Sequence, residues 1–130
     1  MGWAMKASGY IPVKRNNRKQ SYQAFLNTLE AIKAGSSIVV FPEGTRSKDG
    51  SIGVFKKGSQ LLAERAKVPV VPVTIVGTRD IIRKGSILIY PNVVRIIISP
   101  YVTIDGDNKK KGGEILQDIR KTICSNFKPE

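Results

Sequence analysis

The sequence predicts an α/β layered domain with a central mixed, largely parallel sheet flanked by helices. Two observations lead to this fold class. Short, continuously aliphatic runs alternate along the chain with segments of helical periodicity. Such runs are typical of strands that are covered on both faces. The 130 residues, of which 41% are hydrophobic, are also enough to build one core. We therefore expect residues 1–130 to belong to a single domain.

The first half of the chain begins with a short candidate strand, Tyr10 to Val13, and continues into a helix. Apolar residues recur there at helical spacing, and Gly35 suits the position just beyond the helix end. The recurring residues are Tyr22, Phe25, Leu26, Leu29 and Ile32. We interpret this stripe as core and assign it no chemistry. A continuous aliphatic run, Ser37 to Phe41, then predicts a strand buried on both faces.

The second half predicts a shorter helix, three further strands and a final helix. The short helix is expected between Gly58 and Lys67. The strands are expected at Val70 to Val76, Ser86 to Tyr90 and Val93 to Ser99. The final helix follows from apolar residues at helical spacing, which are Ile115, Leu116, Ile119 and Ile123.

The composition excludes several kinds of site. The chain has no histidine and one cysteine, so it cannot by itself supply an imidazole base, a Ser-His-Asp triad or a disulfide framework. The cysteine, Cys124, lies beside the last apolar stripe, which favours a small buried residue over a nucleophile. We expect no metal site. The formal net charge of +12 predicts attraction to phosphates, nucleic acid or the anionic face of a membrane.

One segment carries candidate chemistry: Phe41-Pro42-Glu43-Gly44-Thr45-Arg46-Ser47, at the end of an expected strand. In open α/β sheets, ligands bind beyond the carboxyl ends of strands. Gly44 lets the backbone approach a ligand, and Thr45 and Ser47 can donate to phosphate oxygens. Arg46 can bind a phosphate through two parallel hydrogen bonds. The alternative interpretation is a charged turn in which Glu43 and Arg46 pair at the surface.

Together with three other segments, this stretch resembles the glycerolipid acyltransferase family, which includes the 1-acylglycerol-3-phosphate acyltransferases. Residues 41–47 are similar at every position to the family's third motif, Phe-Pro-Glu-Gly-Thr-Arg-Ser. Gly9 to Arg15 resembles the second motif, which ends in a basic residue, and Val68 to Val73 resembles the fourth, with its paired prolines. Phe55 to Gly58 stands where the family commonly has Phe-Lys-x-Gly. The resemblance extends from Gly2 to about Val102.

The resemblance implies transfer of an acyl group from acyl-CoA or acyl-carrier protein to the free hydroxyl of a lysophospholipid, with no cofactor. It assigns five residues to the glycerol phosphate of this acceptor: Arg15, Glu43, Gly44, Thr45 and Arg46. The segment Val68 to Val73 would shape the sheet. The implied partners are the lysophospholipid, the acyl donor and an anionic membrane surface, and no nucleic acid. The protein would work at the cytoplasmic face of that membrane.

The family's first motif is a histidine followed four residues later by an aspartate, and a chain without histidine lacks it. In the family this histidine is the general base on the acceptor hydroxyl, and the aspartate orients it. We therefore expect a fragment without the N-terminal elements of its domain, inactive on its own. The alternative is a non-catalytic module that binds phosphate or anionic lipid. Nucleic-acid binding is disfavoured, because no helix-turn-helix pattern, zinc spacing or RNA-binding aromatic signature is present.

Overall fold

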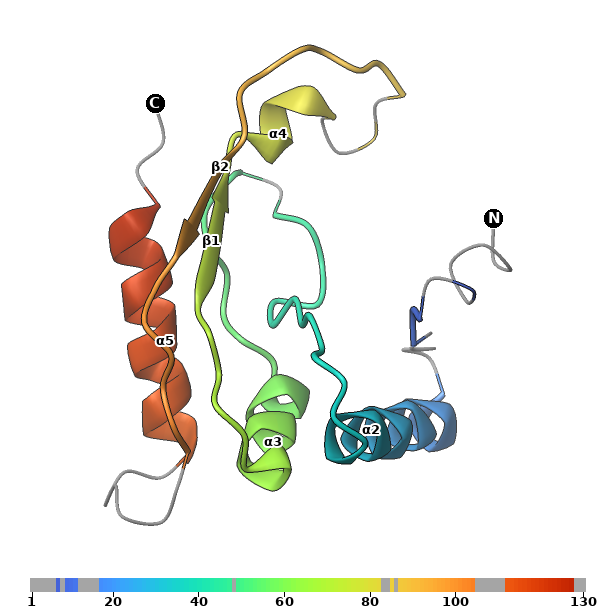
Figure 1. Cartoon of the computed structure of the whole chain (residues 1–130). Helices are drawn as coiled ribbons and strands as arrows, with labels where there is room; N and C mark the ends of the chain where they lie inside the picture. The colour runs from blue at the N-terminus through green and yellow to red at the C-terminus, as the bar shows by residue number, and fades with distance from the viewer. Residues whose placement is uncertain are drawn as a thin grey trace. The chain divides into compact units, whose positions relative to one another are not determined.

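The computed structural model describes residues 7, 9–11, 17–47, 49–82, 85, 87–104 and 112–127. The chain divides into two compact units, Met1–Val40 and Phe41–Glu130, and Figure 1 traces their helices and strands. No helix in the described ranges is both long and apolar enough to cross a bilayer.

The first unit contains α2, Arg18–Lys33, which is closed by hydrogen bonds at both ends. The Asn17 side chain accepts a hydrogen bond from the amide of Gln20 at 3.0 Å, which satisfies one unpaired donor of the first turn. At the other end, Gly35 adopts a φ of +91°, and its amide and that of Ser36 donate to carbonyls of the last turn. The predicted helix and its glycine terminus are confirmed.

The apolar stripe of α2 is less buried than a core position requires. Ala24 is buried, whereas Phe25 and Leu29 are half-buried. Tyr22 is exposed, and its ring stacks on that of Phe25 with the centroids 6.3 Å apart. The prediction that this stripe forms a core is therefore only partly confirmed within the described residues.

Two expected strands are absent from the described residues. Residues 37–41 form no strand, and Val39 and Phe41 are largely exposed, so the prediction of a fully buried strand is wrong. Of the strand expected at Ser86 to Tyr90, residues 87–90 form none either, and Ser86 lies outside the described residues. The physical reason is that a strand is held by a ladder of hydrogen bonds to a neighbouring strand, and no ladder among the described residues includes either segment. Of the candidate first strand, Tyr10 and Ile11 are not in a strand, and the rest lies outside the described residues.

The second unit is built on an antiparallel pair of strands, β1 (Val73–Val76) and β2 (Arg95–Ile98). Val73 lies opposite Ile98, and Val76 lies opposite Arg95. The strands are joined through α4, Thr78–Ile81, which is far shorter than the crossover helix that a parallel pair needs. The sheet of the described residues is thus two-stranded and antiparallel, and the largely parallel central sheet is not confirmed.

The core of the second unit lies between this sheet and two helices, α3 (Lys57–Ala66) and α5 (Gly112–Asn126). Figure 1 shows α5 running beside the strand pair, and α5 contacts both β1 and α3. The buried centre of α5 is made of Ile115, Leu116 and Ile119. The predicted short helix and final helix are both confirmed.

Only one face of the sheet is covered. Thr74 and Val76 of β1 are buried, while Val73 and Ile75 are exposed, and Ile96 and Ile98 are exposed on β2. The strands therefore alternate between a covered face and an exposed face, although their sequence was interpreted as covered on both. Continuous hydrophobicity here leaves an apolar surface.

Candidate functional site

The motif at residues 41–47 begins with a tight turn. The amide of Gly44 donates to the carbonyl of Phe41 at 3.0 Å, which places Pro42 and Glu43 at the centre of a β-turn. Proline suits the first central position because its φ is already fixed near the required value. Gly44 itself has a φ of +70°, a conformation that glycine adopts at little cost. The residue types of the motif thus determine the path of its backbone.

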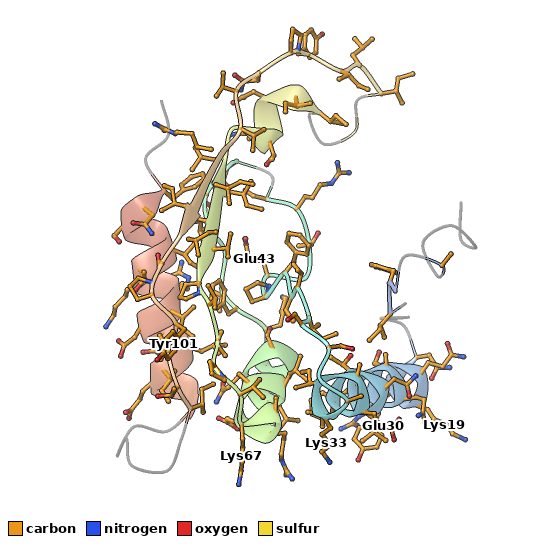
Figure 2. The ribbon with its side chains drawn as sticks, viewed as in Figure 1. Lys19, Glu30, Lys33, Glu43, Lys67 and Tyr101 are labelled. Atoms are coloured by element: carbon orange, nitrogen blue, oxygen red, sulfur yellow. The ribbon has the colours of Figure 1, made fainter. Side chains whose placement is uncertain are left out.

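The Glu43 carboxylate holds the motif against a later part of the same loop. Its Oε2 accepts a hydrogen bond from the amide of Gly53 at 2.7 Å, and the pair is partly buried. Figure 2 labels the Glu43 side chain. A Cβ at position 53 would lie 2.9 Å from that oxygen, so glycine is the residue that lets the carboxylate approach. Glu43 therefore closes the segment between residues 43 and 53 into a loop.

The start of the motif is tied to α3. The Pro42 carbonyl accepts from the amide of Lys56 at 2.8 Å and from the hydroxyl of Ser59 at 3.2 Å. Lys56 is the N-cap residue of α3. These bonds bring the Phe55-Lys56-Lys57-Gly58 segment to the base of the motif. Two sequence segments singled out separately therefore meet in space.

The far side of the loop is held by an arginine of α5. Arg120 donates from Nε to the carbonyl of Gly53 and from Nη2 to the carbonyl of Ile52, each at 2.9 Å. A planar guanidinium presents such parallel donors in a fixed geometry. Because the Gly53 amide binds Glu43, a chain of contacts runs from α5 through Gly53 to the motif.

A second arginine and an aspartate organise the middle of the loop. Arg79 of α4 donates to the carbonyl of Asp49. The Asp49 carboxylate accepts from the hydroxyl and amide of Ser51 at 2.8 and 3.0 Å, and from the hydroxyl of Ser47 at 2.9 Å. These hydrogen bonds, led by that of the Ser51 hydroxyl, lower the pKa of Asp49 well below its ordinary value. The Ser47 hydroxyl, a candidate phosphate donor in the sequence, thus donates within the loop.

Four of the five predicted site residues, 43–46, are consecutive and lie within the described part of the motif. Glu43 and Gly44 are half-buried in the turn, whereas Thr45 and Arg46 are exposed beyond it. Arg15 lies outside the described residues. Within the described part of the chain, no group of three or more Cys, Asp or Glu side chains is placed to hold a metal ion. The exposed residues Thr45 and Arg46 carry a hydroxyl and a guanidinium, which are suitable donor groups for a phosphate.

The proline segment leads directly into β1. Val70 pairs with Val102 as an isolated antiparallel bridge, and the carbonyl of Pro72 accepts from the amide of Ser99 at 3.0 Å. Pro72 has no amide hydrogen to offer the ladder, so it is suited to the position just before a strand. The segment thus sets the start of β1, in line with the predicted role of shaping the sheet.

A family model described as Acyltransferase matches residues 1–76, which is more than half of the chain. The chain belongs to the acyltransferase family. The matched range contains the whole motif at 41–47 and the basic segment ending at Arg15.

Curated relatives carry a more specific name. The chain is 44% identical over 102 residues to the 1-acyl-sn-glycerol-3-phosphate acyltransferase BAT2, chloroplastic, of Brassica napus, a range that covers 77% of this chain and 30% of that protein. It is also 44% identical over 102 residues to LPAT1, chloroplastic, of Arabidopsis thaliana, named for the same activity, with coverages of 77% and 29%.

A solved structure agrees with these relatives. The crystal structure of the 1-acyl-sn-glycerophosphate (LPA) acyltransferase PlsC from Thermotoga maritima matches with a TM-score of 0.81 and 30% sequence identity. The match covers 96% of this chain and 48% of that one. The chain therefore spans less than half the length of these three relatives.

Proposed function

We propose that the protein transfers a fatty acyl group from acyl-CoA or acyl-carrier protein to the free hydroxyl of 1-acylglycerol 3-phosphate, a step of phospholipid biosynthesis. The observation that carries the proposal is the loop at residues 41–47, whose motif is pinned to α3 through Pro42 and to Gly53 through Glu43. The names of the relatives support the choice of acceptor. The protein would act at the cytoplasmic face of an anionic membrane.

In this proposal the chain supplies the acceptor-phosphate side of the site. Arg46 binds the phosphate through paired N–H donors, and the Thr45 hydroxyl adds a third donor. Gly44 lets the phosphate approach the backbone because it has no side chain. Arg15, from the basic segment that precedes α2, supplies a second cation. Charge-assisted hydrogen bonds of this kind account for selection of a phosphorylated acceptor.

Glu43 has a different task within the same site. A carboxylate repels a phosphate, so direct contact between the two is unfavourable. Its Oε2 is bound by the Gly53 amide, and this bond sets the loop on which Thr45 and Arg46 stand. The other oxygen, Oε1, can accept a hydrogen bond from a hydroxyl of the acceptor's glycerol. We assign Glu43 to positioning the loop and orienting the glycerol.

The reaction joins the acceptor oxygen to the acyl carbonyl carbon and breaks the carbon–sulfur bond of the thioester. The hydroxyl proton passes to a general base, and the departing thiolate takes up a proton. Because this chain contains no histidine, we propose that a histidine and an aspartate elsewhere in a longer protein supply the base. That longer part would also complete the mixed, largely parallel sheet.

The experiment compares the 130-residue chain with the product of the longest reading frame that contains it. We expect acyl transfer from acyl-CoA to 1-acylglycerol 3-phosphate by the longer product and none by the chain alone. Turnover by the chain alone would contradict the proposal that the general base lies outside these 130 residues. A second candidate function, a phosphate-lipid binding module, is favoured by the lack of histidine. The binding-module function would be supported if both the chain and the longer product bound the acceptor and neither transferred an acyl group to it.

A further inference from the structure

The segment between α4 and β2 exposes several large apolar side chains, four of them consecutive at residues 87–90. Ile87 is 95% exposed and Ile89 is 71% exposed. Leu88, Tyr90 and Val93 are exposed as well. Figure 1 shows this part of the chain as an arch that extends past α4 before it enters β2. Contiguous apolar surface of this kind marks an interaction site more often than a surface left to water.

The arch, residues 87–93, is hydrogen-bonded to α4 and to the residue before it. The amide of Tyr90 donates to the carbonyl of Ile81 at 2.9 Å, and the Asn92 side-chain amide donates to the carbonyl of Gly77 at 3.3 Å. The Val93 carbonyl packs so closely on Gly77 that a Cβ at that position would collide with it. These contacts hold the arch at the end that enters β2, through Tyr90, Asn92 and Val93.

Cations flank the apolar residues. The sequence between Gly77 and Arg95 contains four basic residues against a single acidic one, Asp80. The basic residues are Arg79, Arg83, Lys84 and Arg95. The whole chain carries a formal net charge of +12. A basic chain that exposes aliphatic side chains together with an aromatic one has the combination that favours the interface of an anionic bilayer.

We propose that residues 87–93 insert into the surface of an anionic membrane, to which the net positive charge of the chain attracts them. The aliphatic side chains would enter the acyl boundary, and Tyr90 would stay at headgroup depth. The choice of a bilayer over a second protein rests on the proposed function, because a lysophospholipid acceptor resides in a membrane. The arch would thereby hold the 41–47 loop close to its lipid substrate.

The test is cosedimentation of the purified 130-residue chain with vesicles. One set contains phosphatidylcholine alone, and the other contains roughly one quarter phosphatidylglycerol at about 0.15 M salt. We expect binding to the anionic set, and a loss of about tenfold in partitioning for the double variant Ile87→Ser/Ile89→Ser. Equal binding by this variant and the unaltered chain would overturn the proposal.

A matched control uses exposed isoleucines elsewhere in the same unit. Ile96 and Ile98 of β2 are 62% and 71% exposed, so Ile96→Ser/Ile98→Ser removes the same apolar groups from the sheet face. We expect this variant to stay within about twofold of the unaltered chain in partitioning. An equal loss of partitioning in both double variants would indicate nonspecific hydrophobic adsorption and overturn the proposal. Far-ultraviolet circular dichroism checks that both variants retain their helices.

A fluorescent reporter places the arch directly. In a Trp3→Phe background, Ile89→Trp puts the single tryptophan on the arch, and its emission should shift to shorter wavelength with anionic vesicles. Unshifted emission with bound vesicles would contradict insertion. A dimer that dissociates in the Ile87→Ser/Ile89→Ser variant would instead assign the arch to a second copy of the chain.

The membrane proposal and the proposed function can be tested independently of each other. Binding of a water-soluble short-chain lysophosphatidate, measured by calorimetry without vesicles, reports on the acceptor site alone. The arch variants should bind it like the unaltered chain, while Arg46→Ala should bind it more weakly. Loss of lysophosphatidate binding in the arch variants would contradict the separation of the two surfaces.

Discussion

Replacement of Arg120 by alanine tests whether α5 holds the motif loop. The change removes two charge-assisted hydrogen bonds, those from Nε and Nη2 to the carbonyls of Gly53 and Ile52. Each such bond contributes about 1.5–3 kcal/mol, and partial exposure places both near the lower end. We expect Arg120→Ala to lower the free energy of unfolding by about 2–3 kcal/mol. Arg120→Lys, which keeps the charge but has all its donors on one nitrogen, should lose roughly half as much.

The assay is urea unfolding followed by circular dichroism, with amide hydrogen exchange at Gly53 as the local reporter. The Gly53 amide should lose protection in Arg120→Ala, because its hydrogen bond to Glu43 depends on the position of the loop. Lys121→Ala is the matched control, since this neighbouring residue makes an exposed pair with Asp118 at 3.5 Å and should change stability by less than about 0.5 kcal/mol. The reasoning is refuted if Arg120→Ala matches the control in both stability and Gly53 protection.

Three further predictions concern single residues. Glu43→Ala should lower the free energy of unfolding by about 1–2 kcal/mol. Glu43→Gln should lower it by less than ~1 kcal/mol, because glutamine keeps an acceptor for the Gly53 amide. Equal losses for the two variants in urea unfolding would contradict this role of Glu43. Thr74→Val should raise stability by about 1 kcal/mol, because Thr74 is 1% exposed and its Oγ1 has no hydrogen-bond partner in the described residues. A lower melting temperature would indicate that the hydroxyl has a partner. The lowered pKa of Asp49 predicts a contribution that is present above its ordinary pKa of 3.8 and lost as the pH falls below it. Asp49→Asn should therefore flatten the acid limb of thermal stability, and an unchanged limb would rule out this role.

The helices could be predicted from the sequence because their signals are local. Apolar spacing and Gly35 were enough for α2, and the same periodicity predicted α3 and α5. The strands could not be predicted equally well, because aliphatic composition does not say whether a partner is present. Residues 37–41 and 87–90 have strand-like sequences and belong to no strand ladder among the described residues.

The candidate site, like the fold, could be predicted from the sequence only in part. The motif at 41–47 was visible as a string of residue types, and the structure places Glu43 to Arg46 on one loop. What the sequence could not show is how the loop is held. Arg120 is 67 positions from Gly53 and resembles any charged residue on a helix surface. Gly53 is needed for its amide and its missing side chain, neither of which follows from a pattern.

The most direct test of the acceptor-phosphate site is the kinetics of Arg46→Ala in the longer protein that contains this chain. Loss of paired, charge-assisted hydrogen bonds to the phosphate should raise the KM for 1-acylglycerol 3-phosphate by at least about tenfold, with the KM for the acyl donor nearly unchanged. Arg18→Ala, an exposed arginine at the start of α2, is the control and should leave both constants unaltered. An unchanged acceptor KM in Arg46→Ala, or a rise confined to the acyl donor, would contradict the account.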